Sequence, residues 1–195
     1  MSESTPYDWT SIKLIPIDTP EYSWLTAYVL TNAIRRTYEC DPDVVVHQQA
    51  FLPLSADEQN HLKVSKGYLR EVVIRAEGSP IVYARTAVMS ASLEVKRALV
   101  SLGTKPIGES ILYNNAKVTR SPFSYLRIKA IEKTYPQSPI PFHSQLLWAR
   151  KSTFRWGLTQ ILISEFFSPT IRCNDPANHI TPLIRRLPDT DTTRR

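Results

Sequence analysis

Residues 68–76 and 81–89 are two runs rich in β-branched and aromatic side chains, and the short polar break Glu77-Gly78-Ser79-Pro80 separates them. This composition is typical of paired β-strands. Gly78 can adopt the positive φ that a tight turn requires. The pattern therefore predicts a β-hairpin, and we expect this hairpin to lie at the centre of the fold.

Arg70 is the unusual residue of this hairpin. Because strand side chains alternate between two faces, Arg70 shares an apolar face with Val72 and Ile74. Glu71 and Arg75 lie on the other face, which we expect to meet water. A buried guanidinium is costly unless an anion meets it. The anion can be a carboxylate of the protein or of a ligand, and the pattern alone does not separate the two.

A second charge interrupts an apolar face in residues 159–167. Glu165 shares a face with Ile161 and Ile163. In one interpretation, Arg70 and Glu165 form a buried ion pair. In the other, they flank a cavity in which Arg70 holds a substrate carboxylate, while the desolvated Glu165 exchanges a hydrogen bond or a proton with the substrate.

The remaining pattern predicts further helices and strands. In the first half we expect an extended lead-in over 1–17, a helix from Asp18-Thr19-Pro20-Glu21 to Glu39 with a break favoured near Thr31-Asn32, a strand over 44–51, and a helix opened by the capping box Ser55-Ala56-Asp57-Glu58. In the second half we expect a helix from Ser92 to Leu99 that ends before Gly103, and a second helix that begins at Pro106. Strands are expected within 117–133, with a break at Ser121-Pro122, and Pro136, Pro139 and Pro141 mark a surface excursion. A second hairpin is expected over 145–167, with its turn at Gly157-Leu158. Strands joined by hairpins with helices between them predict an α+β fold with an antiparallel sheet.

The predicted helix start at Pro106 is a further candidate for anion binding. It would leave the backbone N–H groups of Ile107 and Gly108 unpaired, beside the positive end of the helix dipole. Such a terminus can bind a carboxylate through main-chain atoms. In most helices, water binds the unpaired N–H groups of such a terminus.

Length and charge narrow the class of protein. A chain of 195 residues is long enough to bury a sizeable core, and we expect one domain over 1–169 followed by a loosely ordered tail over 170–195. The net charge is +6, but the basic residues are scattered, with no run longer than doublets such as Arg35-Arg36. We therefore expect a cationic surface that favours anionic small molecules over nucleic acid.

The two cysteines, Cys40 and Cys173, are far apart and have no Cys or His at metal-ligand spacing. They predict reduced thiols in a cytoplasmic protein and no metal site. The longest apolar runs are too short to span a bilayer, and residues 1–5 do not form a signal peptide, so no stable membrane insertion is expected.

A series of short motifs follows one another in a specific order between about residues 20 and 169. They are Leu69-Arg70-Glu71, Ala76-Glu77-Gly78-Ser79-Pro80, Ala84-Arg85-Thr86, Leu102-Gly103-Thr104-Lys105-Pro106-Ile107-Gly108, Thr119-Arg120, Leu147-Trp148-Ala149-Arg150-Lys151-Ser152 and Ser164-Glu165-Phe166-Phe167-Ser168-Pro169. In this set and order the chain resembles the chorismate pyruvate-lyase family, bacterial enzymes that make 4-hydroxybenzoate for ubiquinone. It departs from the family by extra residues between Trp24 and Ile34, between Ser121 and Leu147, and after Pro169.

The resemblance implies a single antiparallel sheet whose helices close as flaps over a buried ligand. It also implies a lyase that converts chorismate into 4-hydroxybenzoate and pyruvate without a cofactor or a metal. Carried onto this chain, Arg70 and the Ile107 backbone N–H would hold the ring carboxylate. Glu165 would meet the ring hydroxyl, and Ile34 would lie in the first flap.

Chorismate carries a second carboxylate, on its enolpyruvyl group, that requires a further cation. Arg85 and Arg150 are the candidates, and for each a paired sheet arginine is the alternative. We expect a cytoplasmic monomer whose partners are chorismate and its product. The alternative function is a non-catalytic sensor domain of the same fold that binds an aromatic or carboxylate ligand. A nucleic-acid-binding protein ranks third.

Overall fold

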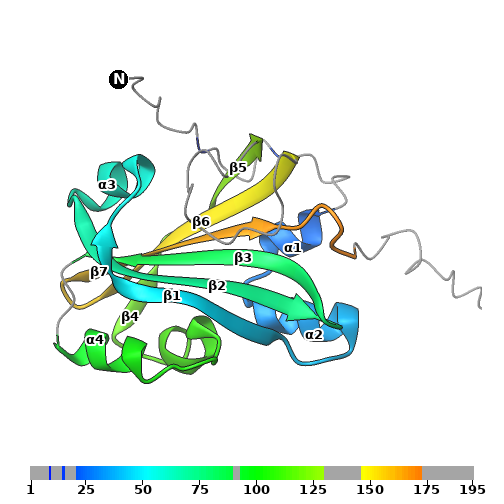
Figure 1. Ribbon diagram of the computed structural model, residues 1–195, viewed down its shortest axis with the longest axis horizontal. Helices are drawn as coiled ribbons and strands as arrows, with labels where there is room; N and C mark the ends of the chain where they lie inside the picture. The colour runs from blue at the N-terminus through cyan, green and yellow to red at the C-terminus, as the bar shows by residue number, and fades with distance from the viewer. Residues whose placement is uncertain (1–8, 10–14, 16–20, 90–92, 130–145, 173–195) are drawn as a thin grey trace, which may run out of the picture.

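One seven-stranded antiparallel sheet organises the fold (Figure 1). The computed structural model describes residues 9, 15, 21–89, 93–129 and 146–172. The strands are β1 (Asp43–Pro53), β2 (Lys66–Ala76), β3 (Ser79–Val88), β4 (Val118–Arg120), β5 (Ser124–Lys129), β6 (Leu146–Trp156) and β7 (Thr159–Phe167). Their order in the sheet is β1-β2-β3-β7-β6-β4, and β5 also pairs with β6. The predicted α+β fold with a single antiparallel sheet is thus confirmed.

The two predicted hairpins are both present and lie next to each other. Glu77 and Gly78 have φ values of 50° and 76°, the two positive values of the turn type that suits the twist of a two-residue hairpin. Gly157 has a φ of 60° at the β6–β7 turn. Strand β3 pairs with β7 from Val82 opposite Phe167 to Val88 opposite Ile161. This pairing joins the two hairpins, so their apolar faces form one continuous surface.

Short helices cover the sheet. They are α1 (Tyr22–Thr26), α2 (Leu30–Tyr38), α3 (Ala56–Leu62), α4 (Leu93–Val100) and the π-helix η2 (Gly108–Leu112). Figure 1 shows α3 on one side of the sheet and α2 and α4 on the other. The predicted capping box opens α3, since the Ser55 N–H donates to Glu58 Oε2 (2.8 Å) and the Glu58 N–H donates to Ser55 Oγ (3.4 Å).

The helix break predicted near Thr31-Asn32 lies a few residues earlier. Ala27 and Val29 have extended ψ values of 118° and 107°, and α2 begins at Leu30. Thr31 and Asn32 fit inside α2 because their side chains bond elsewhere: the Thr31 hydroxyl donates to Glu109, and Asn32 Oδ1 accepts from Arg35 (3.1 Å). These side chains therefore do not compete for the helix backbone.

The helix predicted from Pro106 is a single turn of different geometry. Element η2 begins at Gly108, and the Tyr113 N–H donates to the Gly108 carbonyl, a spacing of five residues, at 2.8 Å. Insertions of this type occur often at functional sites.

The face predicted to meet water is buried where α3 covers it. Glu71 is only 1% exposed, and it pairs with Arg85 of β3. Arg85 also donates to Glu58 of α3 at 2.6 and 3.1 Å. The prediction of an exposed Glu71 was wrong because both faces of the central strands are covered, one of them through a buried ion-pair network.

Several predicted segments fall outside the described residues. These are the lead-in apart from Trp9 and Ile15, the helix start at Asp18-Thr19-Pro20, Ser92, the proline-rich excursion at 136–141, and residues 173–195. Ile171 is buried, and the Arg172 N–H donates to the Tyr38 hydroxyl at 3.0 Å. The domain boundary at residue 169 and the tail beyond it stay predictions.

Candidate active site

Two rows of facing residues cross the sheet beneath α2 and η2. The first row is Arg70, Thr86, Ile163 and Ser152, and the second is Val72, Ala84, Glu165 and Arg150. Arg70 and Glu165 therefore point to the same face, one row and two strands apart. The register of the two hairpins produces this arrangement, because β3 lies between the strands that carry them.

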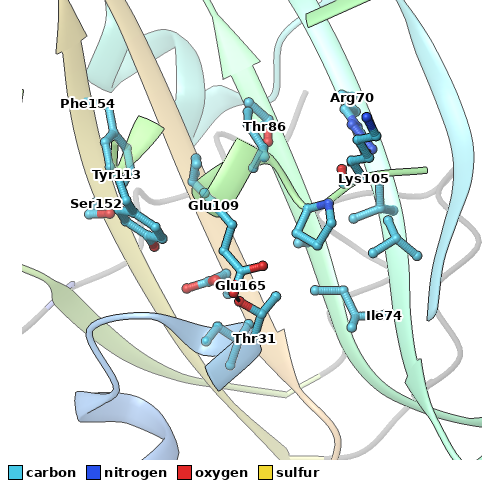
Figure 2. A pocket seen from close by; sticks show the side chains of 18 of the residues that line it. Thr31, Arg70, Ile74, Thr86, Lys105, Glu109, Tyr113, Ser152, Phe154 and Glu165 are labelled. Carbon is cyan, nitrogen blue, oxygen red and sulfur yellow. Dashed lines mark hydrogen bonds between the residues drawn. The ribbon is translucent and has the colours of Figure 1, made fainter. Parts of the chain in front are cut away.

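A cavity of about 60 Å³ lies over these rows. That is several times the ~10–15 Å³ that one water requires. Its floor includes Arg70, Thr86 and Glu165, and its cover includes Thr31 of α2 and residues 105–109. Figure 2 shows Arg70 on one side, Tyr113 and Phe154 on the other, and Glu165 between them. The cavity is closed by two segments that are distant in sequence.

Arg70 is 2% exposed and lacks an anionic partner among the described residues. Its Nη2 donates to the carbonyls of Gly103 (2.9 Å) and Lys105 (3.2 Å). In the described part of the chain, its Nε and Nη1 have no hydrogen-bond partner. Burial lowers the pKa of Arg70, yet a guanidinium stays charged in proteins. The side chain is thus a buried cation with donors to spare.

Glu165 does not neutralise Arg70. Its carboxylate accepts from Nε of Arg150, the residue directly opposite it on β6. The hypothesis of a direct Arg70–Glu165 ion pair is therefore wrong. Arg150 is fully buried, and its Nη1 also donates to the carbonyls of Leu25 (3.0 Å) and Ala27 (2.6 Å). One arginine thus orients the cavity carboxylate and ties the end of α1 to the sheet.

The segment before η2 holds Arg70 and brings Ile107 next to it. The carbonyls that fix Arg70 belong to this segment, and Pro106, Ile107 and Gly108 all line the cavity. Figure 2 shows Lys105 beside Arg70. The first amides of a helical turn lack partners within the turn, and the role predicted for the Ile107 N–H stays a prediction at this end of the cavity.

Glu109 joins the two covering segments. It lines the cavity and accepts from the Thr31 hydroxyl, and it also accepts from Arg35 Nη1 (2.6 Å) and Nη2 (3.1 Å). Arg35 Nε donates in turn to Asp41 Oδ1 (2.7 Å). The hydrogen bonds with Arg35 lower the pKa of Glu109. These contacts bridge α2 and η2 over the cavity.

Tyr113 supplies a hydroxyl on the wall opposite Arg70. Burial, with a smaller contribution from Glu165, raises its pKa to about 12, so the phenol remains a proton donor at neutral pH. A Cβ at position 108 would come within 2.4 Å of the Tyr113 ring. Glycine at this position therefore allows the ring to pack against the start of η2.

One candidate cation of the predicted site lies elsewhere. Arg85 is on the opposite face of the sheet in the network with Glu58 and Glu71, so it cannot meet a ligand in this cavity. Ile34 is fully buried in α2, the helix whose residues Leu30 and Thr31 line the cavity. Its role as a flap residue in contact with the ligand stays a prediction.

Sequence reasoning missed Thr31, Glu109 and Tyr113 as cavity residues. Each lies in a short segment whose orientation depends on tertiary contacts and not on periodicity. The Gly108-Glu109 pair directly after Pro106-Ile107 was the available indication, since an acid at a helix start interacts with the dipole and with neighbouring cations.

In the described residues no group of three or more His, Cys, Asp or Glu side chains could hold a metal ion. None of the described helices has the length and apolar character to cross a bilayer.

Comparison with known proteins gives a consistent result. The family model described as chorismate lyase matches residues 10–175. A probable chorismate pyruvate-lyase of Azoarcus sp. (strain BH72) is 33% identical over 140 residues, 66% of this chain and 72% of the relative. Those of Pseudomonas putida KT2440 and Shewanella loihica are 30% and 29% identical, over 80% and 87% of this chain and 83% and 93% of the relatives. With the match extending over both hairpins and the segments that close the cavity, the chain belongs to the chorismate lyase family.

Proposed function

We propose that this protein is a chorismate pyruvate-lyase, which eliminates pyruvate from chorismate to give 4-hydroxybenzoate. The observation that carries the proposal is the Arg70 guanidinium, which has no anionic partner among the described residues and lines a small cavity together with the Glu165 carboxylate. An anionic, ring-sized ligand with a hydroxyl group suits this arrangement. The relatives named above are probable chorismate pyruvate-lyases. The product would serve ubiquinone synthesis in the cytoplasm.

The reaction requires little chemistry from the protein. The C–H bond at the hydroxyl-bearing ring carbon and the neighbouring C–O ether bond break, the ring becomes aromatic, and the enolpyruvyl group leaves as pyruvate. Aromatisation supplies the driving force. The protein therefore needs to orient two carboxylates and exclude water from the reacting ring.

Each role falls to a group on the cavity wall. Arg70 and the Ile107 N–H would hold the ring carboxylate, in a bidentate pair that uses the free donors of the guanidinium. Glu165, held by Arg150, would accept a hydrogen bond from the ring hydroxyl. The ring hydrogen can pass to a base or directly to the methylene carbon of the leaving group, and the direct route needs no base.

The test is an assay of the purified protein with chorismate. We expect 4-hydroxybenzoate, followed by its ultraviolet absorbance, and pyruvate, followed with lactate dehydrogenase, to appear in equal amounts. The Arg70→Ala variant is the negative control. If the protein binds 4-hydroxybenzoate tightly but forms no product from chorismate, it is a sensor domain and the proposal is wrong.

A further inference from the structure

Chorismate differs from 4-hydroxybenzoate by a second carboxylate, and the cavity must provide a cation for it if the proposed function holds. Arg70 and Lys105 lie together at one end of the cavity (Figure 2), where the ring carboxylate would bind. Arg85 is on the opposite face of the sheet. Arg150 donates through Nε to Glu165 and through Nη1 to main-chain carbonyls, and its Nη2 has no hydrogen-bond partner among the described residues. A further cation is therefore expected at the end of the cavity away from Arg70.

Arg120, at the end of β4, is in a suitable position. It lies directly opposite Phe154 in the β4–β6 register, so its side chain is on the cavity face. Its Cζ is 4.4 Å from the ring centroid of Phe123, 5.8 Å from that of Tyr113 and 5.9 Å from that of Phe154. These three rings line the cavity. Arg120 is not itself among the residues that line the cavity, but its guanidinium stacks on rings of the wall that faces Arg70.

Arg120 is also a cation that has no counter-ion within the described part of the chain. None of the ion pairs between described residues includes it. Its Nη1 donates to the Tyr28 carbonyl at 3.0 Å, and the Tyr28 ring lies 3.8 Å from its Cζ. Aromatic faces stabilise a guanidinium, and Arg120 also makes a side-chain hydrogen bond with Tyr113. A half-buried arginine surrounded by aromatic rings can therefore bind an anion through charge-assisted hydrogen bonds.

Tyr113 connects this cation to the reacting centre. The Tyr113 ring packs against Phe154 with centroids 6.0 Å apart, and Arg120 lies beside it. Burial is the main cause of the raised pKa of Tyr113, Glu165 raises it further, and Arg150 and Arg120 lower it. The Tyr113 side chain lines the cavity beside Arg120.

We propose that Arg120, with the Tyr113 hydroxyl, forms the subsite for the enolpyruvyl carboxylate of chorismate. The subsite recognises the substrate and not the product, because 4-hydroxybenzoate has no carboxylate at that end. The inference rests on the proposed function. It also explains why Tyr28, in the linker between α1 and α2, is tied to β4 through Arg120 at the edge of the cavity.

The test compares substrate and product in the Arg120→Met and Arg120→Lys variants. Methionine keeps an apolar stem among the rings but removes the charge. We expect Arg120→Met to lower kcat/KM for chorismate by roughly 10- to 100-fold, as the loss of a charged hydrogen bond does. The Kd for 4-hydroxybenzoate, measured by calorimetry, should stay within about twofold of the wild type, because the product has no enolpyruvyl carboxylate for Arg120 to meet. Arg120→Lys should recover part of the loss.

The matched control is Arg127→Met. Arg127 is an exposed arginine of β5 stacked on Trp148 at 5.3 Å, outside the cavity lining, and its removal should change neither quantity. If Arg120→Met weakens chorismate and 4-hydroxybenzoate equally, Arg120 only supports the wall and the subsite assignment is wrong. The assignment is also wrong if neither constant changes.

A second measurement separates this inference from the proposed function. A benzoate with a carboxymethoxy group meta to its carboxylate, and the corresponding methoxybenzoate, differ only in the second carboxylate. We expect wild-type protein to prefer the dicarboxylate and Arg120→Met to lose the preference, whether or not chorismate is turned over. No preference in the wild type would overturn the subsite. Absent turnover together with a preserved preference would overturn only the reaction.

Discussion

Arg150 lies directly opposite Glu165 across the β6–β7 ladder, and its Nε donates to the Glu165 carboxylate. The same guanidinium donates through Nη1 to the carbonyls of Trp24 (3.2 Å), Leu25 (3.0 Å) and Ala27 (2.6 Å). The acid of the cavity and the start of the covering helices are thus held by one buried cation. Changes at either residue should affect both the stability of the fold and the geometry of the site.

The Arg150→Met variant tests this coupling. It would leave the Glu165 carboxylate, 14% exposed, without its cation, and breaking a buried pair in this way costs about 3–5 kcal/mol. We expect the free energy of unfolding in urea to fall by that amount. Adding Glu165→Gln removes the stranded charge, so the double variant should lose less than the sum of the single losses. Simple additivity would show that the two residues are not coupled.

Glu165→Gln alone tests whether a proton passes through this residue. The Glu165 carboxylate accepts a hydrogen bond from Arg150, and the amide oxygen of glutamine can still accept a hydrogen bond from a ring hydroxyl. We therefore expect kcat for chorismate to fall by less than the ~10²- to 10⁴-fold typical of a lost general base. A larger fall with an unchanged KM would contradict an orienting role and assign the proton transfer to Glu165.

Arg70→Ala tests the anchor for the ring carboxylate. Truncating one partner of a buried charge pair costs about 2–5 kcal/mol of binding, and 4-hydroxybenzoate should lose that much affinity in a calorimetric titration. Arg75→Ala is the matched control, because Arg75 lies on the same strand but points to the other face. Unchanged product affinity in Arg70→Ala would rule out the anchor.

The sequence predicted both hairpins because their turns and β-branched runs are local features, and it identified Arg70 and Glu165 as charges on apolar faces. It could not identify their partners. Arg150 meets Glu165 through the register of β6 and β7, which the hairpin turn fixes, but the choice of Arg150 over Arg70 depends on how β3 joins the two hairpins. That choice is a tertiary property.

The wet face was predicted incorrectly for a related reason. The alternation of strand side chains places Glu71 and Arg70 on different faces of the sheet. It does not show that α3 packs over the face of Glu71, where Glu58 is a second anion for Arg85. Helical spacing likewise places Leu30 and Ile34 on one side of α2, and both belong to the same apolar cluster. Only the docking of α2 decides that Leu30 also lines the cavity.

Arg85→Met tests the assignment of Arg85 to structure and not to binding. Its removal would leave Glu58 and Glu71, each 1% exposed, as neighbouring buried carboxylates. We expect a loss of about 3–5 kcal/mol in the free energy of unfolding. At a temperature where the variant is folded, KM for chorismate should match the wild type. A raised KM for chorismate together with wild-type stability would show that Arg85 binds the substrate.

The contacts of Glu109 lead us to expect that α2 and η2, which cover the cavity, separate more easily in acid. The pKa of Glu109 is lowered in the folded protein by the hydrogen bonds from Arg35. A carboxylate with a lowered pKa stabilises the fold above its unfolded pKa, and this stabilisation is lost as the pH falls through the folded value. The bridge between α2 and η2 should therefore persist at neutral pH and weaken only below the ordinary range of glutamate.

Hydrogen exchange of the α2 amides, corrected for the intrinsic pH dependence of exchange, measures this loosening. Wild-type protein should show reduced protection of α2 in acid, and Glu109→Gln should show the reduced level already at neutral pH, together with faster release of 4-hydroxybenzoate. The matched control is Asp41→Asn, because Asp41 binds Arg35 on the side away from Glu109 and is largely exposed. If Glu109→Gln keeps wild-type protection across the pH range, the contacts of Glu109 with Thr31 and Arg35 do not hold the cover closed.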